Sequence, residues 1–127
     1  MPLVRIDALD ATSEVELRTI SDGVHRALVE TIGIPPEDRF HVLSRRRAGE
    51  LVYDAGYLGI RRTDRVLFVQ ITLTAGRSLE QKKALFAAIA RLLSESPGVR
   101  PEDVFVNLVE VARENWSFGN GVAQYSL

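Results

Sequence analysis

Pro36-Glu37-Asp38-Arg39-Phe40 recurs 65 positions later as Pro101-Glu102-Asp103-Val104-Phe105, and this repeated segment decides the fold that the sequence predicts. The same interval separates two helix-start patterns, Ser13-Glu14-Val15-Glu16 and Ser78-Leu79-Glu80-Gln81. In each pattern a serine precedes Glu or Gln by three residues, which is the spacing of a capping box. A helix start and a strand start that both recur at one interval indicate two similar structural units in tandem.

Apolar residues between these markers follow strand and helix periodicity in both units. Residues 3–8 alternate between apolar and polar side chains, and residues 66–73 are rich in branched and aromatic side chains, so each unit opens with a strand. Each helix then carries one apolar stripe, formed by Ile20, Val24, Ala27, Leu28 and Ile32 in the first unit and by Leu85, Ile89, Leu92 and Leu93 in the second. Residues 40–43 and 104–111 predict the strands that close the two units.

The pattern predicts one domain over residues 1–127, of the α/β (α+β) class, with repeat units at about 2–44 and 66–112. Each helix must cross over between parallel strands, so the two β-α-β units pool their strands into one mixed sheet with both helices on one face. The other face is also partly apolar and needs a cover, for which self-association is the simplest source. Residues 115–126 predict a turn followed by a short edge strand or hairpin arm.

The composition excludes several classes of function. The chain has 127 residues, a net charge of -1 and no cysteine, so neither nucleic acid binding, nor a membrane span, nor thiol chemistry is expected. His25 and His41 are the only histidines, and neither is spaced for a metal site. His25 is expected to be a partly buried structural residue, and His41 receives no role. The first residues are charged and do not form a signal peptide, which favours a cytoplasmic protein.

Pro2 follows the initiator methionine, which is normally removed before a small residue such as proline. Removal would leave Pro2 as a free secondary amine at the start of a strand. A chain-terminal amine has a pKa of roughly 7.7–8.0, so Pro2 can act as an acid or a base near neutral pH. The alternative is that the proline only protects the chain end from proteolysis.

Arg77 and Asp38 are the charged residues most suited to an active site beside Pro2. Arg77 lies between the end of a strand and the start of a helix, where its guanidinium can hold a substrate carboxylate. The alternative is a surface arginine. Asp38 has an equivalent in the second unit, Asp103, so it can equally be a residue that caps a turn before each strand.

Taken together, these features resemble the tautomerase superfamily, and within it the malonate semialdehyde decarboxylase group. The resemblance covers essentially the whole chain and rests on the segment that starts at Pro2, the tandem repeat, and three further stretches: Pro35 to Phe40, Gly76-Arg77-Ser78 with Glu80-Gln81-Lys82, and Asn115-Trp116-Ser117-Phe118-Gly119. It implies a tautomerase-like fold, a homotrimer with its sheets packed at the centre, and neither a metal nor an organic cofactor.

The resemblance also implies site residues. Pro2, Asp38 and Arg77 would be catalytic, and Arg77 would bind the substrate together with Thr74, Trp116, Phe118 and Tyr125. Trp116 and Phe118 would form the pocket wall, or anchor the trimer interface, or both. The family's decarboxylases commonly carry a second arginine two positions before Arg77, where this chain has Ala75. Thr74 could supply a hydroxyl in place of that missing cation.

These observations favour a cofactor-independent decarboxylase of a small anionic 3-oxo acid, similar to malonate semialdehyde. Pro2 would be its general acid or imine-forming amine, and the same site could hydrate an unsaturated acid. Two alternatives remain open at this point. One is a keto-enol tautomerase of a 2-oxo acid with Pro2 as general base. The other is a trimeric binding protein without catalytic activity.

Overall fold

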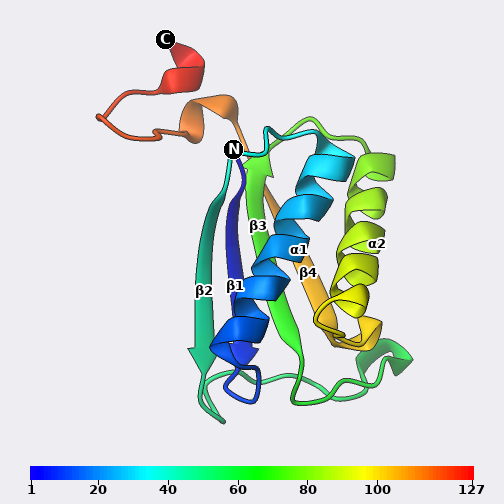
Figure 1. The fold of residues 1–127 in the computed structure, drawn as a ribbon. Coiled ribbons are helices and arrows are strands. Elements are labelled where there is room, and N and C mark those ends of the chain that lie inside the picture. Colours follow the sequence, from blue (N-terminus) through cyan, green and yellow to red (C-terminus); the bar gives the residue numbers. More distant parts are fainter.

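The computed structural model describes residues 1–127 and contains one four-stranded sheet (Figure 1). Its strands are β1 (Leu3–Leu9), β2 (Phe40–Arg46), β3 (Leu67–Thr74) and β4 (Val104–Val111), in the order β2-β1-β3-β4. Strand β2 is parallel to β1, and β4 is parallel to β3, as a crossover helix requires. The central strands β1 and β3 pair antiparallel and join the two units. The predicted mixed sheet is confirmed.

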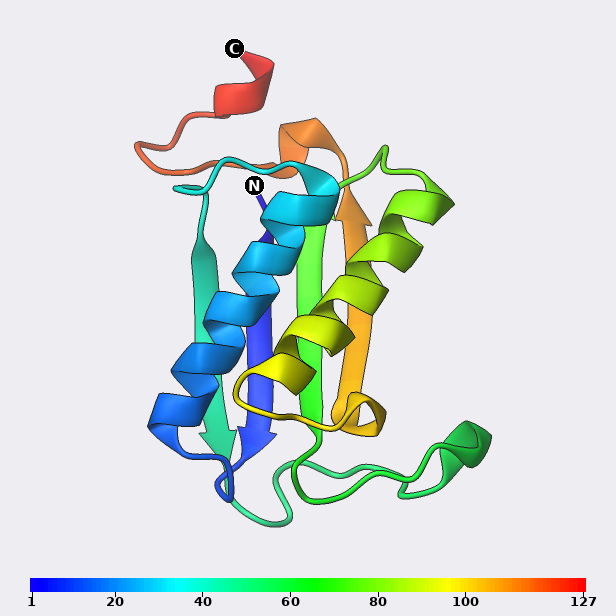
Figure 2. The same ribbon diagram turned by 45° about the vertical axis from the view of Figure 1, so that its right-hand side comes forward.

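Helices α1 (Glu14–Ile32) and α2 (Leu79–Glu95) cover one face of this sheet (Figures 1 and 2). Both predicted capping boxes are formed, because Ser13 Oγ accepts a hydrogen bond from the Glu16 amide and Ser78 Oγ accepts one from the Gln81 amide, each at 3.1 Å. Helix α1 ends at Gly33, which adopts a left-handed conformation with φ of 74°. Neither helix is long and apolar enough to cross a membrane.

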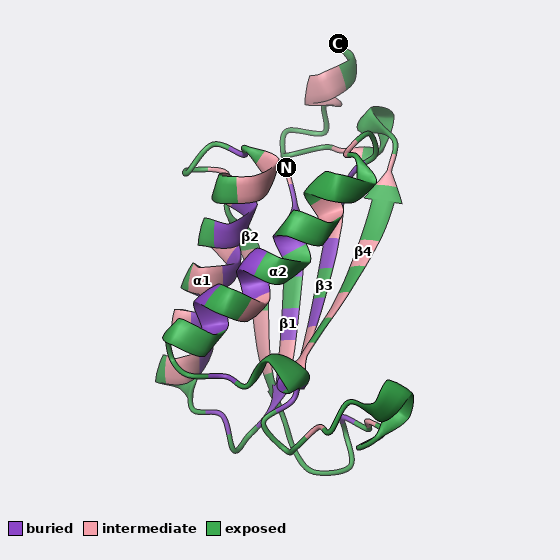
Figure 3. Ribbon diagram, turned by 90° about the vertical axis from the view of Figure 1, so that its right-hand side faces the viewer, coloured by how far each residue is buried: buried purple, intermediate pink, exposed green.

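The hydrophobic core lies between the helices and the sheet. It consists of 19 buried residues, and these include eight of the nine predicted helix-stripe residues, while Ile32 is partly buried and packs against them. Figure 3 shows the buried residues on the facing sides of the helices and the sheet. The helices themselves pack closely at Gly23, where a Cβ atom would lie 2.7 Å from Leu93 Cδ2. A side chain at position 23 would therefore push the two helices apart, because protein cores leave little free volume.

The sheet face opposite the helices has no cover in a single chain. Phe40 and Phe105 are 52% and 49% exposed there, although both are large apolar residues. Phe68 packs against Phe105 with ring centroids 5.2 Å apart, so apolar surface is continuous between β3 and β4. Such a face is typical of an interface with another protein chain.

The C-terminal segment differs from its prediction. Beyond β4 the chain forms two short 3-10 helices, Arg113–Asn115 and Gln124–Ser126, and no strand, so the predicted edge strand or hairpin arm is wrong. Residues 119–121 all have positive φ angles, which interrupt an extended backbone. The segment therefore crosses the end of the sheet near the N-terminus and does not pair with an edge strand (Figure 1).

The two equivalent aspartates occupy different environments. Asp103 is fully buried, and its carboxylate accepts hydrogen bonds of 2.7 Å from the amide and the hydroxyl of Thr63. It thereby ties the long connection between β2 and β3 to the start of β4. Asp38 keeps 18% of its side chain exposed and contacts the amino group of Met1. The turn-capping interpretation therefore describes Asp103, whereas Asp38 lies beside the chain end.

We expect Asp103→Ala to lower the free energy of unfolding by about 2 kcal/mol, because it removes both hydrogen bonds that the fully buried carboxylate accepts from Thr63. Asp38→Ala should cost less, about 1 kcal/mol or below, because Asp38 keeps 18% of its side chain exposed and loses one contact, with the Met1 amine. Urea unfolding followed by circular dichroism measures both values. If both variants lose the same free energy of unfolding, the conclusion that Asp103 is structural and Asp38 is not would be contradicted.

Candidate active site

The sheet topology brings the candidate residues together at one end of the molecule. Strand β1 is antiparallel to β3, so the start of β1 lies beside the end of β3, and Leu3 pairs with Thr72. Because β2 is parallel to β1 and β4 is parallel to β3, the start of β2 and the end of β4 lie at the same edge. Figure 1 shows the N-terminus at this end, next to the C-terminal segment.

The chain terminus lies between a carboxylate and a hydroxyl. The amino group of Met1 forms an ion pair with Asp38, and the Met1 sulfur accepts a hydrogen bond of 3.0 Å from Thr74 Oγ1. Burial, and then the nearby Arg77 guanidinium, lower the pKa of this amine from 8.0 to about 6. The contact with Asp38 opposes that shift. An amine at this position thus titrates in the range useful for proton transfer.

Thr74 connects the terminus to the other candidate residues. Its hydroxyl accepts a hydrogen bond of 3.0 Å from Trp116 Nε1, and its carbonyl accepts one of 3.1 Å from Arg77 Nη1. Thr74 is only 7% exposed, so these contacts are largely shielded from water. They fix the indole and the guanidinium relative to the end of β3.

Two cavities flank Met1. The first has a volume of about 430 Å³ and is lined by Met1, Thr74, Ala75, Gly76, Arg77, Gln81, Arg113 and Tyr125. The second has a volume of about 240 Å³ and is lined by Met1, Pro2, Leu3, Phe40, Trp116, Ser117 and Phe118. The first is polar and has no carboxylate in its lining, whereas the second is mostly apolar. Met1 belongs to both linings and therefore separates the two spaces.

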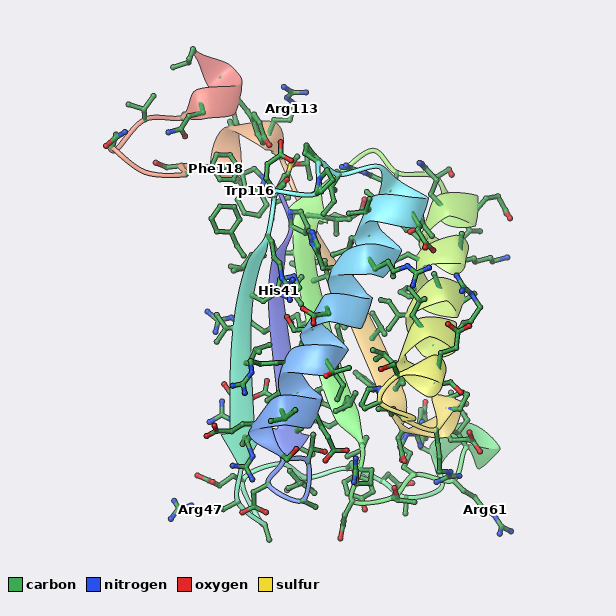
Figure 4. All side chains as sticks on the ribbon, in the orientation of Figure 1. His41, Arg47, Arg61, Arg113, Trp116 and Phe118 are labelled. Atoms are coloured by element: carbon green, nitrogen blue, oxygen red, sulfur yellow. The ribbon has the colours of Figure 1, made fainter.

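The aromatic residues form a stack beside these cavities. Trp116 and Phe118 are nearly parallel, with centroids 5.5 Å apart and an interplanar angle of 8°. Tyr125 meets Phe118 edge-on at 5.0 Å, and Phe40 lies 6.5 Å from Phe118 on its other side. Figure 4 shows Trp116 and Phe118 at the end of the sheet near the chain start. The structure thus gathers all seven of the predicted site residues at this end.

Arg113 is the charged lining residue that the sequence interpretation missed. It follows the end of β4, and β4 is parallel to β3, so it reaches the same edge as Arg77. The predicted parallel pairing of these two strands already implied that residues just after each strand lie close together, so Arg113 could have been predicted beside Arg77. The histidines lie elsewhere: His41 Nδ1 is 2.7 Å from Ser21 Oγ beneath α1, and His25 Nε2 is 2.7 Å from the Pro36 carbonyl.

Comparisons with known proteins agree with this arrangement. Residues 38–119 match a family model described as tautomerase enzyme, and residues 2–51 match a second model with the same description. A probable tautomerase of Bacillus subtilis (strain 168), YusQ, is 42% identical over 124 residues, which are 98% of each chain. A second probable tautomerase of that organism, YrdN, is 28% identical over 98% of this chain and 96% of its own.

Solved structures give the same result. FG41 malonate semialdehyde decarboxylase, inhibited by 3-bromopropiolate, superposes with a TM-score of 0.91 at 40% identity, covering 97% of this chain and 93% of its own. Another malonate semialdehyde decarboxylase superposes with a TM-score of 0.90 at 32% identity, covering 97% and 95%. The chain therefore belongs to the tautomerase superfamily of enzymes, in the malonate semialdehyde decarboxylase-like group.

Proposed function

We propose that this protein is a cofactor-independent decarboxylase of a small 3-oxo acid, with Pro2 as its catalytic amine. The observation that carries the proposal is the position of the chain start beside Arg77, in a cavity without a carboxylate in its lining, while Asp38 contacts the terminal amine from outside that lining. An oxo acid supplies the negative charge that this cavity lacks. Similarity over nearly the whole chain to two malonate semialdehyde decarboxylases supports the same reaction class.

The reaction needs Met1 to be removed, because Pro2 is otherwise part of an amide. Met1 lines both cavities, so its removal joins the polar cavity to the apolar one and exposes the Pro2 nitrogen between them. The space that Met1 leaves lies between Asp38 and Thr74. A substrate of a few carbon atoms fits there, with the aromatic stack as its apolar wall.

In the proposed mechanism Arg77 binds the substrate carboxylate and holds it out of the plane of the carbonyl group. Protonated Pro2 hydrogen-bonds the carbonyl oxygen. Alternatively, neutral Pro2 attacks the carbonyl carbon and forms an iminium ion with loss of water, and water later hydrolyses this ion to release the product and the amine. The bond to the carboxylate then breaks, carbon dioxide leaves, and the electron pair moves into the enolate or enamine that the positive charge stabilises. The α-carbon finally takes a proton to give the aldehyde or ketone. Asp38 orients the amine, or a water molecule if the substrate is hydrated instead.

A tautomerase is the second candidate, and a specific observation favours it. Burial and Arg77 lower the pKa of the Met1 amine to about 6, and the same two causes would act in the same direction on the Pro2 amine once Met1 is removed. A neutral amine acts as a base, not an acid. The curated relatives YusQ and YrdN are described as probable tautomerases. In this alternative, neutral Pro2 would transfer a proton between carbon and oxygen of a 2-oxo acid.

We also propose that the protein is a homotrimer whose exposed sheet faces pack against one another. Exposed apolar side chains on both edge strands of the uncovered face, Phe40 on β2 and Phe105 on β4, support this assembly. A fused 4-OT protein that is a symmetric trimer superposes with a TM-score of 0.76 at 25% identity, covering 94% of each chain. Packing three such faces together would remove them from water.

Pro2→Ala should lower the rate of malonate semialdehyde decarboxylation at least about 100-fold, because alanine retains an amino group but not the secondary amine or its ring. Proton NMR would follow acetaldehyde formation, and intact mass spectrometry would verify that Met1 is absent from both proteins. Equal rates in wild type and variant would exclude proline-dependent decarboxylation. No acetaldehyde from the processed wild type would instead favour the tautomerase.

The pH dependence of kcat/KM should separate the two reactions. A decarboxylase that uses protonated Pro2 loses activity as pH rises through the pKa of that amine, whereas a tautomerase that uses neutral Pro2 gains activity over the same interval. We expect the falling profile with malonate semialdehyde between about pH 5 and pH 9. A rising limb on that substrate would contradict the acid role of Pro2.

Phe105→Asp should convert the trimer to monomers, because it places a charge in the proposed interface. The matched control is Val15→Asp, which adds the same charge at an exposed site in the first turn of α1, where a carboxylate is tolerated. Light scattering after size-exclusion chromatography would give both masses. A monomeric wild-type protein, or a trimeric Phe105→Asp variant, would contradict the proposed interface.

A further inference from the structure

Two guanidinium groups line the polar cavity, although the proposed reaction uses only one. Arg77 donates a hydrogen bond to the Thr74 carbonyl, and the Arg113 guanidinium lies 5.3 Å from the ring centroid of Tyr125. Neither forms an ion pair with a carboxylate. Asp38 contacts the Met1 amine and Glu110 contacts Lys82 at 2.7 Å, so these two carboxylates already have cationic partners.

Several other arginines of the chain have their charge balanced by an ion pair with a carboxylate, namely Arg39, Arg46, Arg65, Arg91 and Arg100. Two like charges that share one cavity without a carboxylate repel each other, and the repulsion is relieved when an anion binds between them. A single carboxylate can occupy the fork of only one guanidinium in a bidentate manner. The second cation therefore indicates a second anionic group on the ligand.

The fold holds the two arginines at neighbouring strand ends. Thr74 pairs with Val111 in the last register position of β3 and β4, and the Ala75 amide donates a hydrogen bond of 2.9 Å to the Val111 carbonyl. Arg77 follows the first strand by three residues and Arg113 follows the second by two. The small side chain of Ala75 keeps the space between them open. Figure 4 shows Arg113 directed outward at the end of the molecule, toward the C-terminal segment.

We infer that Arg113 binds a second carboxylate, so that the site accepts a 3-oxo acid with two carboxylates. This inference rests on the proposed function, in which Arg77 binds the carboxylate that leaves as carbon dioxide. Arg113 holds the carboxylate that remains in the product, and Tyr125 orients the guanidinium through its ring face. A cavity of about 430 Å³ is of the size that binds small ligands. Arg113 is thus a specificity-determining residue.

The test compares 3-oxoglutarate with acetoacetate, which lacks the second carboxylate but is otherwise matched. Arg113→Gln should lower kcat/KM for 3-oxoglutarate about tenfold or more, and should change kcat/KM for acetoacetate less than about twofold. The kcat/KM of Arg113→Lys for 3-oxoglutarate should lie between those of wild type and Arg113→Gln, because lysine keeps the charge and loses the bidentate fork. Arg61→Gln removes the same charge at the opposite end of the molecule (Figure 4) and should leave both substrates unaffected.

A binding experiment separates this inference from the proposed reaction. Glutarate and butyrate differ by one carboxylate and are not decarboxylated, so their dissociation constants can be measured by calorimetry even if neither oxo acid is turned over. We expect glutarate to bind wild type more tightly than butyrate, and Arg113→Gln to abolish the difference. An equal loss for both ligands, or no loss for either, would overturn the role of Arg113. If neither oxo acid is turned over but wild type still binds glutarate more tightly than butyrate, only the proposed decarboxylase activity is rejected.

Discussion

Strands β1 and β3 run antiparallel at the centre of the sheet, and this pairing fixes where the functional groups lie. Each β-α-β unit by itself would place its strand starts at one end and its helix starts at the other. The antiparallel pair reverses one unit against the other, so that the chain start and the start of β2 meet the ends of β3 and β4. The chain start and two guanidiniums from three distant segments consequently line one cavity, and the Asp38 carboxylate from a fourth segment contacts the terminal amine.

The same reversal explains why two equivalent positions serve different purposes. Asp38 and Asp103 occupy the same place in each repeat, but they lie at opposite ends of the sheet. Asp103 is buried against Thr63 and holds the connection between the units, whereas Asp38 is beside the chain terminus and is partly accessible. Arg77 has no cationic counterpart after β1, where the equivalent position is the buried Thr12. One end of a duplicated fold thus carries structural contacts, and the other carries charge.

The electrostatics of the site follow from its partial burial. Desolvation and Arg77 lower the pKa of the terminal amine, and the contact with Asp38 opposes them, so the balance decides whether an amine there is an acid or a base. The proposed decarboxylation needs a protonated amine and the alternative tautomerisation needs a neutral one, although both proposals use the same residues. The uncompensated pair Arg77 and Arg113 adds positive potential, which an oxo acid with two carboxylates offsets more completely than one with a single carboxylate.

The sequence by itself determined the two units, both capped helices, the buried stripes and the identity of seven residues that gather at one end, because periodicity and capping are local properties of the chain. It also indicated an uncovered sheet face. Only the tertiary structure decided that Arg113 lines the cavity, that Met1 separates two spaces, and that Asp38 and Asp103 differ, because these facts depend on which strand ends are neighbours. The edge strand or hairpin arm predicted within residues 115–126 was wrong, since Gln124–Ser126 form a short 3-10 helix, and so short a segment carries no periodicity that distinguishes the two.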